Sequence, residues 1–366
     1  MVVRHPHRLP LLALGMLALL TGLWAGLARL GWAVPLPRPG FSSLHGPLMV
    51  SGFLGTLISL ERAVALGRPW AYAAPLLTGL GGVSLIVGAP LLAAQWLMLA
   101  GSLGLVAIFA AIIRRHPALY TFTMGGGSLV WALGNLLWCL GWPVFLVVFW
   151  WAAFLVVTIA GERLELARLQ QVTGAAQATF LLLLGILLTG LLLLGWSFDG
   201  GVRLFGLGLA GLALWLGRHD IARRTVKQAG LTRFIAICLL TGYVWLGISG
   251  LSAMWFGGVP VGPQYDATLH AFFLGFVFAM IFAHAPIIFP AVLGARMAYR
   301  PLFYAHVVLL QVTLVVRFIG DAAGWSAGRQ VGGLLNAVML LLFLVNTVSA
   351  LQSPPERAGT AQGRGA

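Results

Sequence analysis

Long apolar stretches recur along almost the whole chain, separated by short segments that hold its few charged residues. A transmembrane helix needs about 20 predominantly apolar residues, and twelve stretches of this chain have that length. The pattern therefore predicts an all-α fold, a polytopic membrane helix bundle with about twelve transmembrane helices. The predicted spans are about 10–33, 44–66, 72–90, 92–113, 120–141, 143–160, 174–196, 201–217, 234–256, 266–293, 301–320 and 328–351.

The composition agrees with that pattern. The chain is 60% hydrophobic and only 8% charged, whereas a membrane β-barrel would show short segments of alternating polarity. No polar stretch is long enough to form a soluble domain, so we expect a single membrane domain over residues 10–351. Residues 1–9 form a short basic tail, and the polar residues 352–366 form a tail that we expect to be disordered.

Charge sets the predicted orientation. The chain has 22 basic residues against 8 acidic ones. The basic residues lie in short loops beside apolar spans, which is typical of membrane topology and contact with anionic lipids rather than of nucleic-acid binding. If the N-terminus is cytoplasmic, 17 of the 22 lie on the cytoplasmic side, as the positive-inside rule expects. This predicts a bacterial inner-membrane protein with both termini cytoplasmic. The remaining five are Arg29, Arg38, Arg203, Arg317 and Arg329.

Four of the eight histidines fall within predicted spans, where a polar ring is costly without a partner. His45 and His270 open the second and tenth spans, which run in the same direction, so both lie near the outer face. His284 follows His270 by 14 residues, about 21 Å along a helix. His306 lies in the eleventh span, which runs the opposite way, at about the depth of His284. The topology thus predicts two depth-matched pairs.

The outer pair, His45 and His270, suits ligation of a haem iron by two histidines. Such ligation needs two neutral imidazoles on facing helices at one depth, and the interior of a helix bundle suits the apolar body of haem. The two haem propionates need basic partners. Arg317, late in the eleventh span, and Arg38, in the first outer loop, are the candidates, because an arginine can bind a carboxylate through two hydrogen bonds.

Other interpretations of these residues stay open. A histidine inside a membrane is often only hydrogen-bonded to a neighbouring helix, and Arg317 could simply extend its charge to the outer interface. His284 and His306 could hold a second metal ion, but two histidines do not complete a metal site. Proton relay and packing are the alternatives for this inner pair.

The stretches around the two outer histidines resemble those of a known family. Twelve spans with a histidine opening the second and the tenth resemble subunit I of the haem–copper oxidases. The closer resemblance is to the NnrS family, short twelve-span members of that superfamily. The NnrS patterns HxHEMxxGF in span two and LHAxxxG in span ten, with an arginine late in span eleven, are matched by His45, Met49, Gly52, Phe53, Leu269, His270, Ala271, Gly275 and Arg317.

The resemblance implies a fold like subunit I of the haem–copper oxidases, with haem at His45 and His270. It also implies a role linked to nitric oxide, denitrification-related stress or redox metabolism, with nitric oxide or a redox protein as partner. Copper is the second cofactor that it implies. The chain departs from the pattern at Pro47 and Leu48, which replace a histidine and a glutamate. Spans six and seven contain none of the histidines that copper needs in those oxidases.

Three classes of function are compatible with these features. The first is a haem-binding membrane protein of NnrS type. The second is a small-molecule or metal transporter, since twelve spans are common in transporters and Pro286 and Pro290 could break span ten. The third is a membrane assembly factor for a respiratory complex. We find no nucleophile, acid–base pair or nucleotide motif that would assign an enzymatic reaction, and no pattern that gives the oligomeric state.

Overall fold

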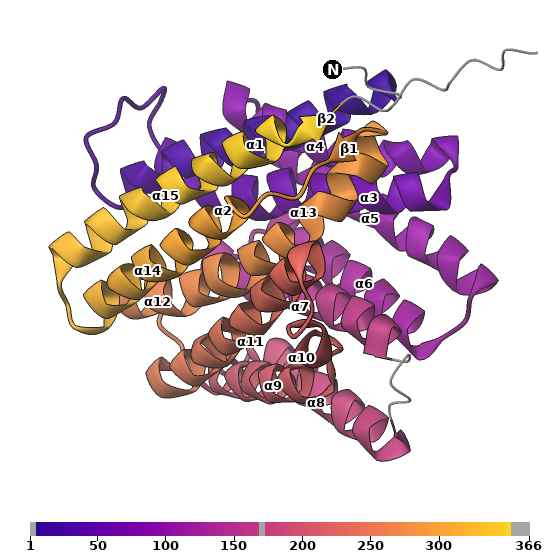
Figure 1. Cartoon of the computed structure of the whole chain (residues 1–366). Coiled ribbons are helices and arrows are strands. Elements are labelled where there is room, and N and C mark those ends of the chain that lie inside the picture. The colour runs from indigo at the N-terminus through magenta and orange to yellow at the C-terminus, as the bar shows by residue number, and fades with distance from the viewer. Residues whose placement is uncertain (1–4, 168–172, 353–366) are drawn as a thin grey trace, which may run out of the picture.

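The computed structural model describes residues 5–167 and 173–352, which form an all-α bundle with two short strands (Figure 1). Eleven helical segments are long and apolar enough to cross a membrane, as expected of a polytopic membrane helix bundle. The longer helices are α1 (Leu9–Arg29), α3 (Thr56–Leu66), α4 (Ala73–Val87), α5 (Leu91–Arg115), α6 (Leu119–Cys139), α7 (Val144–Ala167), α8 (Gly174–Leu193), α9 (Phe198–His219), α11 (Gly230–Phe256), α13 (Phe278–Leu293), α14 (Phe303–Ala322) and α15 (Ser326–Ser349).

Helix α6 is the difference between these eleven segments and the twelve spans predicted from the sequence. It covers the predicted fifth span and has 21 residues, about 31 Å of helix. It falls outside the set of eleven because it is less apolar, with buried Thr121, Ser128 and Asn135 among its residues. These polar groups find partners inside the bundle: the Asn135 side-chain oxygen, for example, accepts from Trp151 Nε1 at 3.0 Å.

The two spans that begin near the outer histidines are not uniform α-helices. The first, Phe41–Leu66, starts with a 3-10 turn and the short helix α2 (His45–Pro47), continues as the π-helical segment η3 (Leu48–Gly55), and ends in α3. The second, Pro263–Leu293, consists of α12 (Pro263–His270), the π-helical segment η6 (Ala271–Val277) and α13. His270 thus lies directly before a π-helical segment, and His45 lies three residues before one. Such segments are rare and often occur at functional sites.

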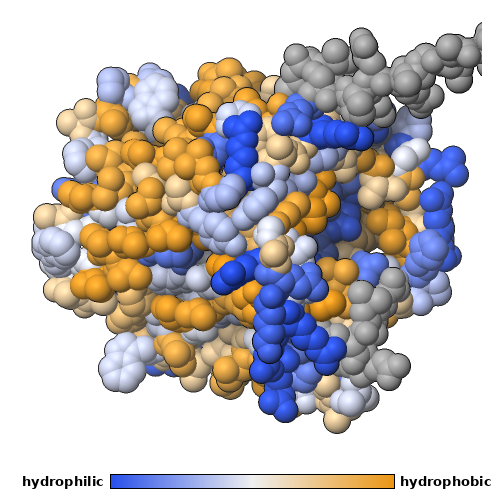
Figure 2. Space-filling view, viewed as in Figure 1, coloured by the Kyte–Doolittle hydropathy of each residue, from blue (hydrophilic) through white to orange (hydrophobic). Residues whose placement is uncertain are grey.

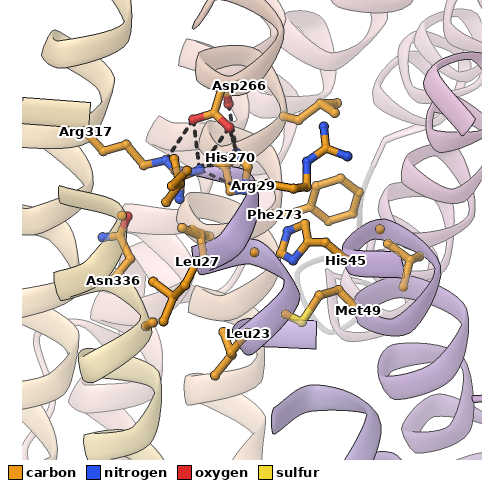
Figure 3. A pocket seen from close by; sticks show the side chains of 18 of the residues that line it. Leu23, Leu27, Arg29, His45, Met49, Asp266, His270, Phe273, Arg317 and Asn336 are labelled. Atoms are coloured by element: carbon orange, nitrogen blue, oxygen red, sulfur yellow. Dashed lines mark hydrogen bonds and ion pairs between the residues drawn. The ribbon is translucent and has the colours of Figure 1, made fainter. Parts of the chain in front are cut away.

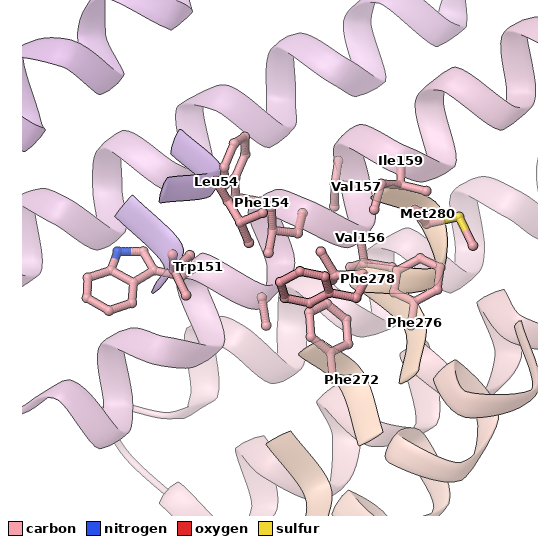
Figure 4. Packing of buried hydrophobic residues seen from close by; sticks show 14 of the residues in the cluster. Leu54, Trp151, Phe154, Val156, Val157, Ile159, Phe272, Phe276, Phe278 and Met280 are labelled. Carbon is pink, nitrogen blue, oxygen red and sulfur yellow. The ribbon is translucent and has the colours of Figure 1, made fainter. Parts of the chain in front are cut away.

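Helix α7 forms the centre of the bundle. Of the eleven candidate spans it is the most buried: 78% of the residues in its most apolar 18-residue stretch are buried inside the protein. A helix that is hydrophobic on all sides is expected in such a position. Figure 4 shows Val156 of α7 close to Phe278, with Phe272 and Phe276 of η6 beside them. The π-helical segment after His270 therefore rests on the most buried helix of the fold.

The periphery of the bundle is apolar, as a lipid-facing surface should be. Large hydrophobic side chains stay exposed on several helices, among them Leu214, Trp255 and Leu182. In the space-filling view, apolar residues cover much of the visible face, and the hydrophilic ones gather in limited areas (Figure 2). A soluble protein rarely exposes so much contiguous apolar surface, so this distribution favours a membrane-embedded bundle.

Both ends of the described chain lie beside the C-terminal end of α13. Arg8 donates to the carbonyl oxygens of Ala291 and Val292, each at 3.2 Å. Strand β1 (Arg296–Met297) pairs antiparallel with β2 (Leu351–Gln352), so Gln352, expected as the first residue of the tail, is part of a strand. The two ends therefore lie on one face of the bundle (Figure 1). The remainder of the predicted C-terminal tail, 353–366, and residues 1–4 lie outside the described residues.

Candidate functional site

The structure brings His45 and His270 together. Their ring centroids are 6.0 Å apart and their planes differ by 24°. His45 comes from the second span and His270 from the span that ends in α13, and these are separated by 225 positions in the chain. The order and direction of the spans predict only that the two rings lie near one face of the membrane. Their direct juxtaposition is a property of the fold.

In each of the two rings, Nδ1 faces a backbone carbonyl oxygen. His45 Nδ1 lies 2.8 Å from the carbonyl oxygen of Gly22 in α1, and His270 Nδ1 lies 3.0 Å from that of Asp266, one helical turn earlier. A carbonyl oxygen can only accept a hydrogen bond, so a neutral ring in this position carries its proton on Nδ1. The other nitrogen, Nε2, is then the acceptor atom, which is the form of histidine that binds a metal. In His270 this atom lies 3.3 Å from Arg317 Nη2.

Helix α1 has a small residue where the His45 ring packs. A side chain at Gly26 would place its Cβ only 2.7 Å from His45 Nδ1, closer than real Cβ atoms come. One turn earlier, a Cβ at Gly22 would lie 2.8 Å from the sulfur of Met49. Two glycines spaced by four residues therefore leave room for two side chains of the second span, and they orient His45 towards the interior.

Asp266 connects His270 to two arginines. Its carboxylate is 3.1 Å from His270 Nδ1 and accepts two hydrogen bonds from Arg317, Nε to Oδ2 and Nη2 to Oδ1, both at 2.9 Å. Arg329 Nε lies 4.0 Å from Asp266 and 3.1 Å from the buried Asp321. Two acids and two bases therefore form one network beside His270.

A cavity of about 160 Å³ adjoins both histidines (Figure 3). Its walls are charged at one end and apolar at the other. The charged end is formed by Arg29, Asp266, Arg317 and Arg329. The apolar end lies deeper along the spans and is formed by Leu54, Val148, Phe278 and Leu340. The arrangement suits an amphiphilic ligand with an apolar body and anionic groups directed to the charged end.

The same stretch of chain matches one family model. Residues 8–352 match the model described as "Domain of unknown function (DUF8744)". The chain belongs to the DUF8744 family. The match covers every described α-helix and therefore includes the cavity and both histidines of this DUF8744 protein. No curated protein and no solved structure matches it.

Arg38 lies elsewhere than expected for a propionate partner. Its guanidinium donates to the carbonyl oxygen of Leu85 near the end of α4, and it does not line the cavity. Arg29 and Arg329 line the charged end instead, together with the predicted Arg317. The sequence identified both as outer-side residues but gave no way to tell which of the five would point inward. The 30–40 segment carries Arg38 away from the opening.

Asp266 was not anticipated as a site residue in the DUF8744 chain, although the sequence contained a usable signal. It precedes His270 by four residues, and residues so spaced lie on one face of a helix. An acid in that position within an outer helix end can pair with the imidazole and with a basic residue of a neighbouring span. The structure shows both contacts.

The inner histidines have different surroundings from each other. His284 Nδ1 lies 2.6 Å from the carbonyl oxygen of Met280. His306 packs among aromatic rings, 4.8 Å from Phe282 and 5.3 Å from Phe343 between centroids, and Asn346 Nδ2 lies 3.2 Å from its Nδ1. Within residues 5–167 and 173–352, no group of three or more His, Cys, Asp or Glu side chains could hold a metal ion. A second metal site at these two histidines, one of the alternatives for the inner pair, thus has no third ligand of these types there.

Proposed function

We propose that this protein is a haem-binding integral membrane protein in which His45 and His270 are the two axial ligands. The observation that carries the proposal is the state of the two rings: both commit Nδ1 to a backbone carbonyl and sit with centroids 6.0 Å apart. The two Nε2 atoms would then bind one iron, with Arg317 Nη2, 3.3 Å from His270 Nε2, turned aside. Haem bound there would supply a one-electron redox centre.

The cavity supports this choice of ligand by its polarity. Porphyrin is apolar, and the deep walls are leucine, valine and phenylalanine. The two propionates are anionic, and Arg29 and Arg329 lie at the charged end. Arg317 is already paired with Asp266, so it supports His270 more directly than it supports a propionate.

The size of the cavity sets one requirement. Small-molecule sites typically have roughly 300–1,000 Å³, and this cavity has about 160 Å³. Side chains that line it must therefore turn aside when a porphyrin enters. Met49 and Phe273 project from the two histidine spans (Figure 3), and Met49 adapts easily because its side chain has three rotatable bonds. With that adjustment, the donor atoms and the distribution of charge fit haem.

The similarity of the two histidine stretches to the NnrS family directs the proposal further, to a fold like subunit I of the haem–copper oxidases and a role linked to nitric oxide or redox metabolism. This protein's own residues would bind the cofactor, orient the imidazoles and keep the apolar end free of water. Copper has no comparable support, because His284 and His306 lack a third ligand among the described residues.

A visible spectrum tests the proposal directly. We expect the detergent-purified protein, from cells grown with ample haem, to show a sharp α-band in the reduced-minus-oxidised spectrum. Pyridine haemochrome analysis should give about one haem per chain, since a single pair of facing histidines is present in the cavity. A colourless protein obtained under these conditions would refute the haem assignment and leave the histidines to transport or packing.

The orientation in the membrane needs a separate measurement. We propose that both termini are cytoplasmic in a bacterial inner membrane, which the strong excess of basic residues on that side supports. A green fluorescent protein fused to the C-terminus should fluoresce, and alkaline phosphatase fused there should be inactive. Fusions in the loop between α1 and η2 (Phe41–Leu44) should give the opposite pattern. Active phosphatase at the C-terminus would reverse the assigned orientation.

A further inference from the structure

The two histidines differ in the acceptor groups that face their Nδ1 atoms. The Nδ1 proton of His45 is directed at a neutral acceptor, the Gly22 carbonyl. His270 Nδ1 lies 3.0 Å from the backbone oxygen of Asp266 and 3.1 Å from the carboxylate oxygen Oδ1 of the same residue. A carboxylate behind a metal-bound histidine fixes the ring and makes it a stronger electron donor. The site is therefore asymmetric, with the stronger donor on the α12 side.

Arg317 holds this carboxylate in place. Its two hydrogen bonds to Asp266 both measure 2.9 Å, the fork-to-fork arrangement that arginine and carboxylate favour. The arginine side chain is only 6% exposed and that of Asp266 13%, so solvent screens the pair weakly. The Nη2 atom of Arg317 also lies 3.3 Å from both ring nitrogens of His270. The negative charge of Asp266 and the positive charge of Arg317 thus both act on the imidazole of His270.

We infer that Asp266 and Arg317 are opposing positioning residues that set the reduction potential of a haem iron bound through His270, an inference that rests on the proposed haem site. A negative charge beside the ligand favours the more positive, oxidised iron and lowers the potential. A positive charge does the reverse. Hydrogen bonding and charge around an axial ligand are recognised determinants of haem potential.

Two single substitutions separate this role from simple structural support. Asp266→Asn removes the negative charge and keeps the size of the side chain, so the midpoint potential should rise. Arg317→Gln removes the compensating positive charge, so the potential should fall. We expect each shift to reach at least a tenfold change in the one-electron equilibrium, about 59 mV. The double variant should return towards the wild-type value.

The measurement is a spectroelectrochemical titration of the α-band in purified, haem-loaded protein. Asp199→Asn is the matched control, because Asp199 is also an acid that pairs with a residue four positions later, Arg203, yet it is exposed and lies away from the cavity. Its potential should equal that of the wild type. A potential that falls in both single variants indicates that the site has merely opened to water, and it overturns the inference, as does no shift in either.

A second pair of variants covers the case in which Asp266→Asn does not accumulate. Asp266→Glu and Asp266→Gln have the same size and differ in charge, so the glutamine variant should have the higher potential. Equal potentials in this pair overturn the inference. Failure of the underlying haem proposal is distinguishable, because the wild-type protein would then show no α-band to titrate.

Discussion

Replacing either His45 or His270 by alanine is expected to remove the sharp α-band and to lower the haem content of the purified protein by about tenfold or more. The reason is that each ring supplies one of two ligands. Changes behind a ligand already cost roughly 10- to 100-fold in metal affinity, so loss of the ligand itself should cost at least as much. The measurement is haem per chain by pyridine haemochrome, with protein yield recorded for each variant.

His284→Ala provides a matched control for this experiment. His284 lies in the same span as His270, and its Nδ1 also faces a backbone carbonyl, that of Met280. It does not line the cavity. The variant should therefore keep its α-band and most of its haem. A reversed result, with haem lost in His284→Ala and retained in His45→Ala, would place the cofactor at the inner end of the bundle and contradict the proposal.

The second large effect is expected at Gly275, in the π-helical segment after His270. A Cβ at this position would lie 2.3 Å from Cγ and 2.4 Å from Cβ of Trp245. The tryptophan cannot move aside freely, because its Nε1 donates to Gln311 and its ring packs against Phe318 at 6.1 Å between centroids. Overpacking of this kind typically costs about 1–3 kcal/mol. Gly275→Ala should therefore lower the melting temperature of the detergent-purified protein.

Gly126→Ala is the corresponding control. Gly126 lies in helix α6, and a Cβ there would have no neighbour within 4 Å. Alanine favours a helix over glycine by roughly 0.5–1 kcal/mol, so this variant should melt at the wild-type temperature or slightly above it. If Gly275→Ala and Gly126→Ala melted alike, the close packing of η6 against Trp245 would not contribute to stability as described.

The spans could be predicted from the sequence because hydrophobicity and length alone decide whether a helix suits a membrane. The histidine pair at 45 and 270 could be predicted because topology fixes depth, and depth needs only the order and direction of spans. The direction in which a side chain points around its helix axis cannot be predicted in the same way, because its environment depends on which helices are neighbours. His284 and His306 share an expected depth, yet their partners, Met280 for one and Asn346 for the other, are on different helices.

Two features of the site could not be predicted from periodicity. The π-helical segments η3 and η6 change the rotation of the spans just after each histidine, and a regular 3.6-residue repeat gives no indication of them. Which arginines line the charged end depends on which helix ends are neighbours, so Arg38 was expected there, whereas Arg29 of α1 and Arg329 of α15 were found. Asp266 is intermediate, because its four-residue spacing from His270 was available in the sequence.

The separation of the two histidines along the chain has a consequence for biosynthesis. Ribosomes add about 5–20 residues per second, so the 225 positions between His45 and His270 take roughly 10–45 s to complete. During that interval the first helices are already made, and Gly22 and Gly26 of α1 face the span of His45 before His270 has been synthesised. The pocket closes only after α12, α14 and α15 arrive, and pairing of β2 with β1 uses nearly the last described residues. The complete set of walls around any molecule in the cavity therefore exists only late, after most of the chain has left the ribosome.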